Sequence, residues 1–169
     1  LAVQAQPGQR ILDLCAAPGG KTLALAADVG PTGLVVACDV RPRRLRLLRQ
    51  TLATAGAHRA RIVHVPLTGR LPFTAAFDAV LVDAPCSGLG TVRRDPDIKW
   101  RRVDADLPRL AGRQLDLLSR AAETVAPGGR LVYATCSSEP DENEDVVRRF
   151  LETRPDFALH PIPATGPLA

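Results

Sequence analysis

Short, almost continuously apolar segments alternate along this chain with longer segments of helical periodicity, and this alternation restricts the fold more than any other feature. The apolar segments predicted as strands cover residues 10–14, 34–39, 61–65, 77–83 and 130–135, with a sixth over 157–162. The segments between them are predicted as helices over 20–29, 42–55, 104–126 (with a break or late start near Pro108) and 140–151. Strands that are apolar on both faces and separated by helices form a parallel sheet that helices cover on both sides.

The predicted fold is therefore α/β and Rossmann-like, with a doubly wound, mostly parallel sheet of strand order 3-2-1-4-5. Such sheets bind ligands beyond the carboxyl ends of their strands, so the residues that follow each strand are the candidate site residues. All four cysteines lie in or beside these strand ends: Cys15, Cys38, Cys86 and Cys136. Cys38, in the middle of an apolar strand, is assigned to the core.

A length of 169 residues predicts a single domain over 1–169. The chain begins with Leu1 and contains no methionine, so we expect a domain cut short at both ends, with a terminal strand or strands missing from its sheet. There is no apolar segment of about 18 residues and no secretory leader, which favours a cytoplasmic protein without membrane contact. The absence of a CxxC pair, with only three histidines, predicts no metal site.

The charge balance is moderately basic, with 22 basic residues, 18 acidic residues and a net charge of +4. Twenty of the basic residues are arginines, whose planar guanidinium suits phosphate recognition. The arginine content of a protein also increases with the GC content of its coding sequence, as do the proline and alanine contents. The charge alone therefore does not decide whether the chain binds nucleic acid.

A glycine-containing loop follows the first predicted strand and opens the first helix, at Cys15-Ala16-Ala17-Pro18-Gly19-Gly20-Lys21-Thr22. It matches neither a phosphate loop, because Cys15 replaces the required glycine, nor a dinucleotide GxGxxG. Asp39 ends the second strand, where an acid can accept hydrogen bonds from both ribose hydroxyls. The alternatives are a glycine turn that serves chain geometry alone and an acid at a helix N-terminus. Taken together, the loop and Asp39 favour a nucleoside cofactor, and S-adenosylmethionine fits better than NAD or ATP.

Two further strand ends bring thiols and a carboxylate to the same edge. Asp83 and Cys86 stand three residues apart in DAPCSGLGT (83–91), and the fifth strand ends in Thr135-Cys136-Ser137. In the predicted order the fourth and fifth strands are neighbours about 5 Å apart, so Cys86 and Cys136 should face one pocket. A disulfide between them is the alternative, disfavoured in a reducing compartment.

Three segments carry a family resemblance: DLCAAPGGKT (13–22), DAPCSGLGTVRRDPDIKW (83–100) and GGRLVYATCSSEPDENE (128–144). They resemble the motifs of the Sun, or RsmB-type, RNA cytosine-C5 methyltransferases, and the bacterial 16S ribosomal RNA branch is the most similar. The resemblance runs from about residue 7 to residue 151. It implies a class I S-adenosylmethionine-dependent methyltransferase that acts on RNA, with ribosomal RNA as the expected target, through a covalent adduct between a cysteine and cytosine C6.

The resemblance also implies roles for individual residues. Cys136 would be the nucleophile, Cys86 would assist release of the product, and Asp83 would lie near both cofactor and cytosine; the residues alone do not decide which thiol does what. Lys21 would approach either the methionine carboxylate or the substrate. The cofactor would contact a set of loop and strand-end residues: Cys15, Ala16, Ala17, Pro18, Gly19, Gly20, Lys21, Asp39 and Asp83.

One position departs from the family pattern. Thr68 stands where the family carries an acid after the third strand, so it can accept a hydrogen bond from the adenine amino group but without a charge. Thr68 is therefore a further candidate cofactor contact. We expect the adenine to bind more weakly, or in a different position, than it would beside the acid of the family pattern.

A basic cluster follows the Cys86 loop and is a candidate RNA contact: Arg93, Arg94, Lys99, Arg101 and Arg102. A solvated basic face is the alternative, and Trp100 is expected to pack the loop. We expect a monomer with RNA as its partner. The competing hypotheses are a transfer RNA cytosine or a uracil as target, or a non-catalytic RNA-binding module. Retention of both Cys86 and Cys136 argues against the last, because binding alone needs neither thiol.

Overall fold

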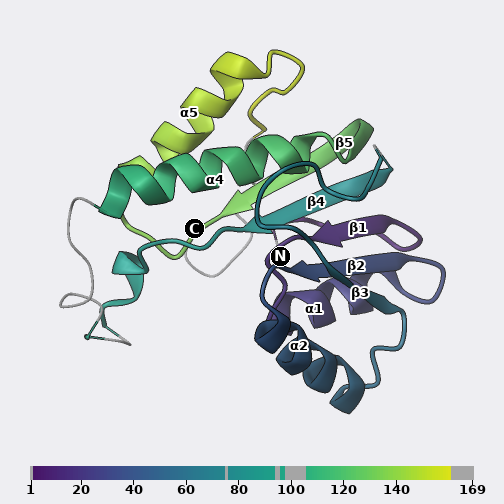
Figure 1. The fold of residues 1–169 in the computed structure, drawn as a ribbon. Helices are drawn as coiled ribbons and strands as arrows, with labels where there is room; N and C mark the ends of the chain where they lie inside the picture. The colour runs from purple at the N-terminus through teal and green to yellow at the C-terminus, as the bar shows by residue number, and fades with distance from the viewer. Residues whose placement is uncertain (1, 75, 94–95, 98–105, 161–169) are drawn as a thin grey trace, which may run out of the picture.

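The computed structural model describes residues 2–74, 76–93, 96–97 and 106–160. Its sheet runs in the order β3-β2-β1-β4-β5, and every neighbouring pair is parallel (Figure 1). The strands are β1 (Arg10–Asp13), β2 (Leu34–Asp39), β3 (Ala60–His64), β4 (Phe77–Asp83) and β5 (Val125–Ala134). The predicted strand order is confirmed.

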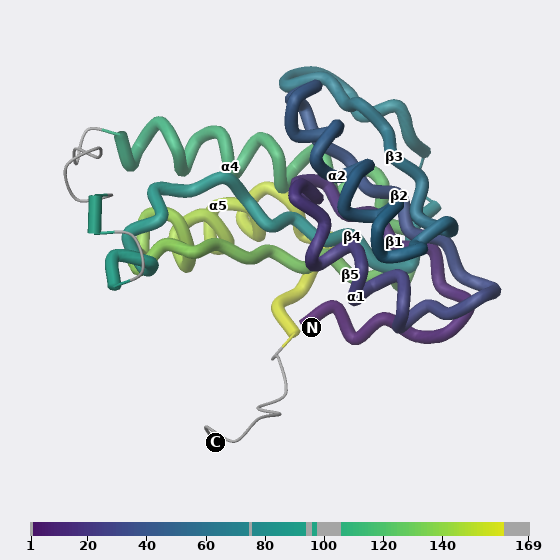
Figure 2. The backbone as a smooth tube through the Cα atoms, turned by 90° about the horizontal axis from the view of Figure 1, so that it is seen from below, coloured from purple at the N-terminus to yellow at the C-terminus, as the bar shows by residue number. Residues whose placement is uncertain are grey.

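Helices cover both faces of this sheet. They are α1 (Gly20–Val29), α2 (Pro42–Thr54), α4 (Asp106–Ala122) and α5 (Glu144–Thr153), with short 3-10 turns η1 (Leu89–Thr91) and η2 (Pro140–Glu142). Helices α1 and α2 lie on one face and α4 on the other, with α5 beside α4 (Figures 1 and 2). None of the helices in the described part of the chain is long and apolar enough to span a membrane.

Alternate residues of each strand supply the two halves of the core, since successive side chains of a strand point to opposite faces. Leu12, Val80 and Val82 belong to the cluster that contains Leu118 of α4 and Phe150 of α5. Ile11, Val35 and Leu81 belong to the cluster that contains Leu25 and Val29 of α1. The side chain of Cys38 is fully buried in the first cluster, so its assignment to the core is confirmed.

The fifth strand begins earlier than predicted, at Val125 rather than residue 130. The predicted turn at 127–129 lies within this strand as a bulge, because the register moves from the pair Phe77–Val125 to the pair Ala79–Arg130. Gly128 has a φ of +74°, and a Cβ on Gly129 would lie 3.0 Å from the carbonyl oxygen of Phe77. The glycines thus let the strand continue where their local propensity predicts a turn.

Two predicted helices also have different bounds. Helix α4 ends at Ala122, and Pro108 lies in its first turn without a break; residues 104–105 lie outside the described residues. The predicted helix 140–151 is split into η2 and α5 because Asn143 is not helical and its side chain donates to the carbonyl oxygens of Ser137 and Glu139.

The sixth strand predicted over 157–162 is absent at residues 157–160, and residues 161–162 lie outside the described residues. The ring of Phe157 instead packs edge-on against Phe150 of α5, with their centroids 5.4 Å apart. Its backbone N–H also donates to the carbonyl oxygen of Arg154. The apolar side chain that suggested a strand is thus used to cover α5.

Candidate active site

The glycine loop lies across the carboxyl ends of the central strands. Backbone N–H groups fix it there: Leu14 donates to Leu81 of β4 at 3.0 Å, and Ala16 donates to Cys38 of β2 at 2.9 Å. Gly19 has a φ of +119°, and a Cβ there would lie only 3.0 Å from Leu48 Cδ1 of α2. A glycine is needed here both for the backbone conformation and for the close approach of α2.

Two buried aspartates stand beneath this loop, at the ends of β1 and β2. Asp13 Oδ2 accepts a hydrogen bond from Thr22 Oγ1 at 2.7 Å, and Asp39 Oδ1 accepts one from the Arg41 N–H at 3.0 Å. Their other oxygens, Asp13 Oδ1 and Asp39 Oδ2, are buried and accept no hydrogen bond from the described part of the protein, although Asp39 Oδ2 lies 3.3 Å from Arg44 Nε in an ion pair. Buried carboxylate oxygens normally have donors, so the pair fits the hydroxyl donors of a nucleoside cofactor.

Asp13 is a site residue that the sequence reasoning missed, although an acid at the end of an apolar strand was a usable signal. Burial raises the pKa of its carboxyl group from 3.8 to about 6, against the lowering effect of the Thr22 hydrogen bond. The folded chain therefore binds a proton on Asp13 more readily than the unfolded chain does. The resulting stability is present below pH 3.8 and is lost as the pH rises through about 6.

An Asp13→Asn variant should therefore gain stability relative to the unchanged protein as the pH rises, because asparagine stays neutral. Between pH 5 and pH 8 the difference in free energy of unfolding should shift in favour of the variant by about 1–2 kcal/mol. Urea denaturation at both pH values, without added cofactor, measures this, with Asp116→Asn on the exposed side of α4 as the matched control. A difference that does not change with pH would contradict the role assigned to Asp13.

The two thiols predicted to face one pocket are in direct contact. Cys86 Sγ and Cys136 Sγ lie 2.9 Å apart, and the Cys136 N–H donates to Cys86 Sγ at 3.3 Å. Both are free thiols, and Cys136 is the more exposed of the two. Gly90 allows this approach, because its N–H donates to the Cys136 carbonyl oxygen at 3.0 Å and a Cβ would lie only 2.7 Å from that oxygen.

Burial sets the protonation of two cysteines at this edge. Burial and the hydrogen bond with the Cys136 thiol raise the pKa of Cys86 to about 11, and burial raises the pKa of Cys15 to about 12. Both therefore keep their protons at neutral pH. Cys86 can donate its proton in a hydrogen bond to the neighbouring Cys136 sulfur, whereas Cys15 acts as an apolar part of the loop.

An ion pair links the glycine loop to the cysteine pair. Lys21 Nζ, at the start of α1, lies 2.6 Å from Asp83 Oδ2 at the end of β4, and both side chains are partly exposed. The charged groups thus meet at the same edge of the sheet as the thiols, in reach of a molecule that binds over the strand ends.

A buried carboxylate that the sequence reasoning missed holds the two cysteine loops together. Glu142 is fully buried, and its Oε1 accepts hydrogen bonds from the Ser87 N–H at 2.9 Å and from Gln114 Nε2 of α4 at 2.8 Å. Gln114 Nε2 also donates to the Pro85 carbonyl oxygen at 3.0 Å. Burial opposes ionisation of Glu142, but hydrogen bonds from Ser137, Ser87 and Gln114 hold its pKa below the ordinary 4.5. In the sequence Glu142 is one of several acids in a segment predicted as an amphipathic helix, so nothing marked it as buried.

The remaining predicted contacts are exposed or lie outside the described residues. Thr68 is exposed in the loop after β3, and Arg93 is exposed after η1. Of the predicted basic cluster, Arg94, Lys99, Arg101 and Arg102 lie outside the described residues, as does Trp100. Among the residues that are described, no group of three or more His, Cys, Asp or Glu side chains could hold a metal ion.

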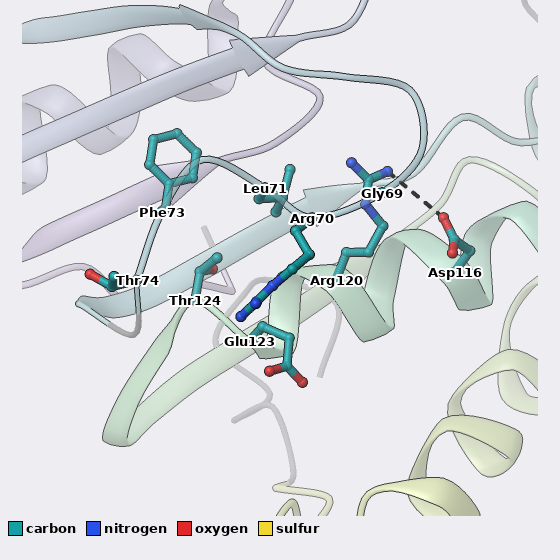
Figure 3. A pocket seen from close by; sticks show the side chains of 9 residues that line it. All are labelled: Gly69, Arg70, Leu71, Phe73, Thr74, Asp116, Arg120, Glu123 and Thr124. Carbon is teal, nitrogen blue, oxygen red and sulfur yellow. Dashed lines mark ion pairs between the residues drawn. The ribbon is translucent and has the colours of Figure 1, made fainter.

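A separate pocket of about 360 Å³ opens between the connection from β3 to β4 and the second half of α4 (Figure 3). Its lining includes Arg70, Phe73, Arg120 and Glu123 and none of the predicted site residues. Arg120 donates to the carbonyl oxygens of Pro66 and Leu67 and so fixes the loop that leads to Thr68. The pocket is thus distinct from the candidate active site.

A parallel sheet of this order, with a glycine loop and buried acids at the ends of its first two strands, defines a Rossmann-like, class I S-adenosylmethionine-dependent methyltransferase fold. Residues 1–169 match the family described as 16S rRNA methyltransferase RsmB/F, and the chain belongs to that family. Its cofactor is S-adenosylmethionine, and the loop with its two buried carboxylates fits that molecule.

Individual relatives agree with this family. The chain is 52% identical over 83 residues to ribosomal RNA small subunit methyltransferase B of Salmonella paratyphi B, which covers 49% of this chain and 19% of the relative. The solved structure of PH0851 is 34% identical with a TM-score of 0.91, over 96% of this chain and 37% of that one. NSun6 from Pyrococcus horikoshii, solved with SFG, is 28% identical with a TM-score of 0.79, over 90% of this chain and 39% of that one. The chain thus spans well under half the length of each of these proteins.

Proposed function

We propose that this chain transfers a methyl group from S-adenosylmethionine to C5 of a cytosine in ribosomal RNA, through a covalent bond between Cys136 Sγ and cytosine C6. The observation that carries the proposal is the pair of free thiols, 2.9 Å apart, at the ends of adjacent strands β4 and β5 and close to Asp83 in the sequence. A methyltransferase whose substrate atom is already nucleophilic would need neither thiol.

Cytosine chemistry explains the need for a thiolate. C5 of cytosine is a poor nucleophile, and addition of a thiolate to C6 makes C5 enamine-like, so that C5 can attack an electrophilic methyl group. S-adenosylmethionine supplies that methyl group on its sulfonium. The proton on C5 then leaves to a base, the C6–S bond breaks, and the cysteine is regenerated as a thiolate.

The environments of the two thiols support different roles. A free thiol of pKa about 8.5 is only a few per cent ionised at pH 7, so the nucleophile needs help to ionise. Cys136 is exposed toward the edge where a base would bind, and Cys86 keeps its proton and can donate it as a hydrogen bond to Cys136 Sγ. Cys86, in contact with Cys136 Sγ, is the neighbouring group that would assist release of the product.

The charged groups at the same edge complete the proposed site. Asp83 would hold N3 or N4 of the cytosine while C6 is attacked, with Lys21 at 2.6 Å as its partner. Asp39, whose buried Oδ2 accepts no hydrogen bond from the described part of the chain, would bind the ribose of the cofactor, and the loop from Cys15 to Lys21 would enclose it. A ribosomal RNA target is supported by the family description and by the name of the relative from Salmonella paratyphi B.

Trapping of the covalent intermediate tests this proposal. A Cys86→Ala variant should accumulate a denaturant-resistant complex when mixed with a small-subunit ribosomal RNA transcript and cofactor, because release is slowed. The complex is read as a slowly migrating band in a denaturing gel, with Cys136→Ala and the double variant as controls. Neither control should give the band.

Other outcomes would contradict specific parts of the proposal. A band from Cys136→Ala but not from Cys86→Ala would reverse the roles of the two thiols. No band from any variant, with S-adenosylmethionine binding intact by calorimetric titration, would reject the covalent route. A transfer RNA transcript tested in parallel decides the class of RNA.

A further inference from the structure

The charges of this chain are distributed very unevenly along the sequence. Residues 40–77 contain eight arginines and no acidic residue, whereas the rest of the chain has 14 basic and 18 acidic residues. The net charge of +4 therefore arises entirely from this one segment. The cysteines, Asp83 and Lys21 all lie outside the segment.

The fold gathers residues 40–64 of this segment on one flank of the molecule. It forms α2 and the edge strand β3, which pairs only with β2 within the described sheet (Figure 1). Arg43, Arg46 and Arg49 are exposed along α2, and Arg59 and Arg61 are exposed at the start of β3. We call these five residues the basic flank. From Arg43 to Arg49 the helix rises about 9 Å, so the flank is an extended strip of positive charge.

Within the described part of the chain, no acidic side chain forms an ion pair with an arginine of the basic flank. Arg43, Arg46 and Arg49 form no ion pair with any residue that the structure describes, whereas Arg109, Arg148 and Arg154 on other surfaces pair with neighbouring acids. Arg44 differs from its neighbours, because it pairs with Asp39 and donates to the Ala17 carbonyl oxygen beneath the glycine loop. It supports the cofactor loop and is not part of the flank.

We propose that the basic flank binds the phosphate backbone of the RNA whose cytosine enters the active site; this inference rests on the proposed function. Helix α2 starts directly after the carboxyl end of β2. In the sheet, β2 lies three strand positions from β5, so the start of α2 is about 14 Å from the end of β5, which Cys136 follows. At about 3.4 Å per nucleotide in a stacked strand, roughly four nucleotides cover that distance. One RNA can therefore reach the thiols and the start of the flank, at Arg43, together.

The flank does not have the character of a membrane-binding surface. The apolar side chains Leu45, Leu48 and Leu52 of α2 are buried in the core, and Leu47 is the large apolar residue of this helix that is exposed. An amphipathic membrane helix needs a continuous exposed apolar face, which α2 uses for packing instead. Phosphate contacts by guanidinium groups need only the exposed arginines.

A charge-neutralised variant tests the basic flank. Arg43, Arg46 and Arg49 are changed together to glutamine, which keeps helix propensity, and binding to a small-subunit ribosomal RNA transcript is titrated at several salt concentrations. Affinity should fall about tenfold or more at low salt, and the slope of log K against log salt should decrease by about 2, because each phosphate contact contributes about 0.7 on a single strand. The matched control changes Arg113, Arg148 and Arg149, exposed on α4 and α5, to glutamine and should bind like the unchanged protein.

Each other outcome overturns the assignment. If the flank variant and the control have the same RNA affinity and the same salt slope, the basic flank is not an RNA contact. The trapping experiment with Cys86→Ala could still support the proposed function in that case. If the unchanged protein does not bind RNA, the assignment of the basic flank as an RNA contact is wrong. If the covalent complex is not trapped either, the proposed function is wrong as well. Tighter binding to phosphatidylglycerol vesicles than to RNA would reassign the flank to a membrane. Unchanged S-adenosylmethionine affinity confirms in every case that the variant is folded.

Discussion

Replacement of Cys136 by alanine is expected to abolish methyl transfer while the affinity for S-adenosylmethionine stays nearly unchanged. Without the thiolate, C5 of cytosine keeps its low nucleophilicity, so the loss should be a thousandfold or more, which corresponds to roughly 4 kcal/mol or more of activation free energy. Cofactor binding should persist because Cys136 lies beyond β5, whereas the glycine loop and Asp39 follow β1 and β2. Incorporation of labelled methyl groups into RNA and calorimetric titration of cofactor measure the two quantities.

A second cysteine serves as the matched control for this prediction. Cys38 is also a free thiol, but it is fully buried in the core on β2. Cys38→Ala should lower stability through the loss of packing while methyl transfer by the folded protein continues. Retention of methyl transfer by Cys136→Ala, or a large loss of cofactor affinity in that variant, would contradict the assignment of Cys136 as nucleophile.

The fold was predictable because its signals are local and repeated. Each strand is a short apolar run and each helix carries an apolar face, so alternation alone predicts a parallel sheet. The same reasoning predicted that Cys86 and Cys136 face one pocket, since both follow adjacent strands and the carboxyl ends of parallel strands share one edge. Those positions depend on strand order and not on side-chain detail.

The differences between prediction and structure come from contacts between segments far apart in the chain. The turn signal at Gly128 and Gly129 was overridden because pairing with Phe77 and Ala79 extends β5 through a bulge. Phe157, which suggested a sixth strand, packs on Phe150 instead. Asp13 lies in an apolar strand and Glu142 stands among four other acids in residues 139–145, so the local pattern singles out neither residue. Burial of a single carboxylate depends on partners that a local pattern does not contain.

Glu142 carries the other large expected effect, on stability. The carboxylate accepts hydrogen bonds from the Ser87 N–H, which follows Cys86 directly, and from Gln114 of α4. Glu142→Ala removes this buried acceptor and leaves space behind, so the free energy of unfolding should fall by about 3–5 kcal/mol. Glu142→Gln keeps one acceptor oxygen and should cost less, about 1–2 kcal/mol. Urea denaturation at pH 7 measures both.

The pH dependence of stability provides an independent test of the same contact. Hydrogen bonding holds the pKa of Glu142 below 4.5 in the folded chain, so the unfolded chain binds a proton there more readily. The stability contributed by Glu142 is therefore present above pH 4.5 and is lost as the pH falls through the lower folded value. The unchanged protein should lose stability on acidification in this range more steeply than Glu142→Gln does.

The neighbouring Asp141 offers the matched control, because it lies in the same 3-10 turn but is exposed. Asp141→Ala should change the free energy of unfolding by less than about 0.5 kcal/mol, as exposed substitutions usually do. Equal effects at Asp141 and Glu142 would show that the turn, and not the buried carboxylate, is responsible. Since Ser87 adjoins Cys86, Glu142→Gln should also lower the rate of methyl transfer under conditions where it is fully folded. A variant that is destabilised yet transfers methyl groups at the full rate would limit Glu142 to stability and remove it from the positioning of Cys86.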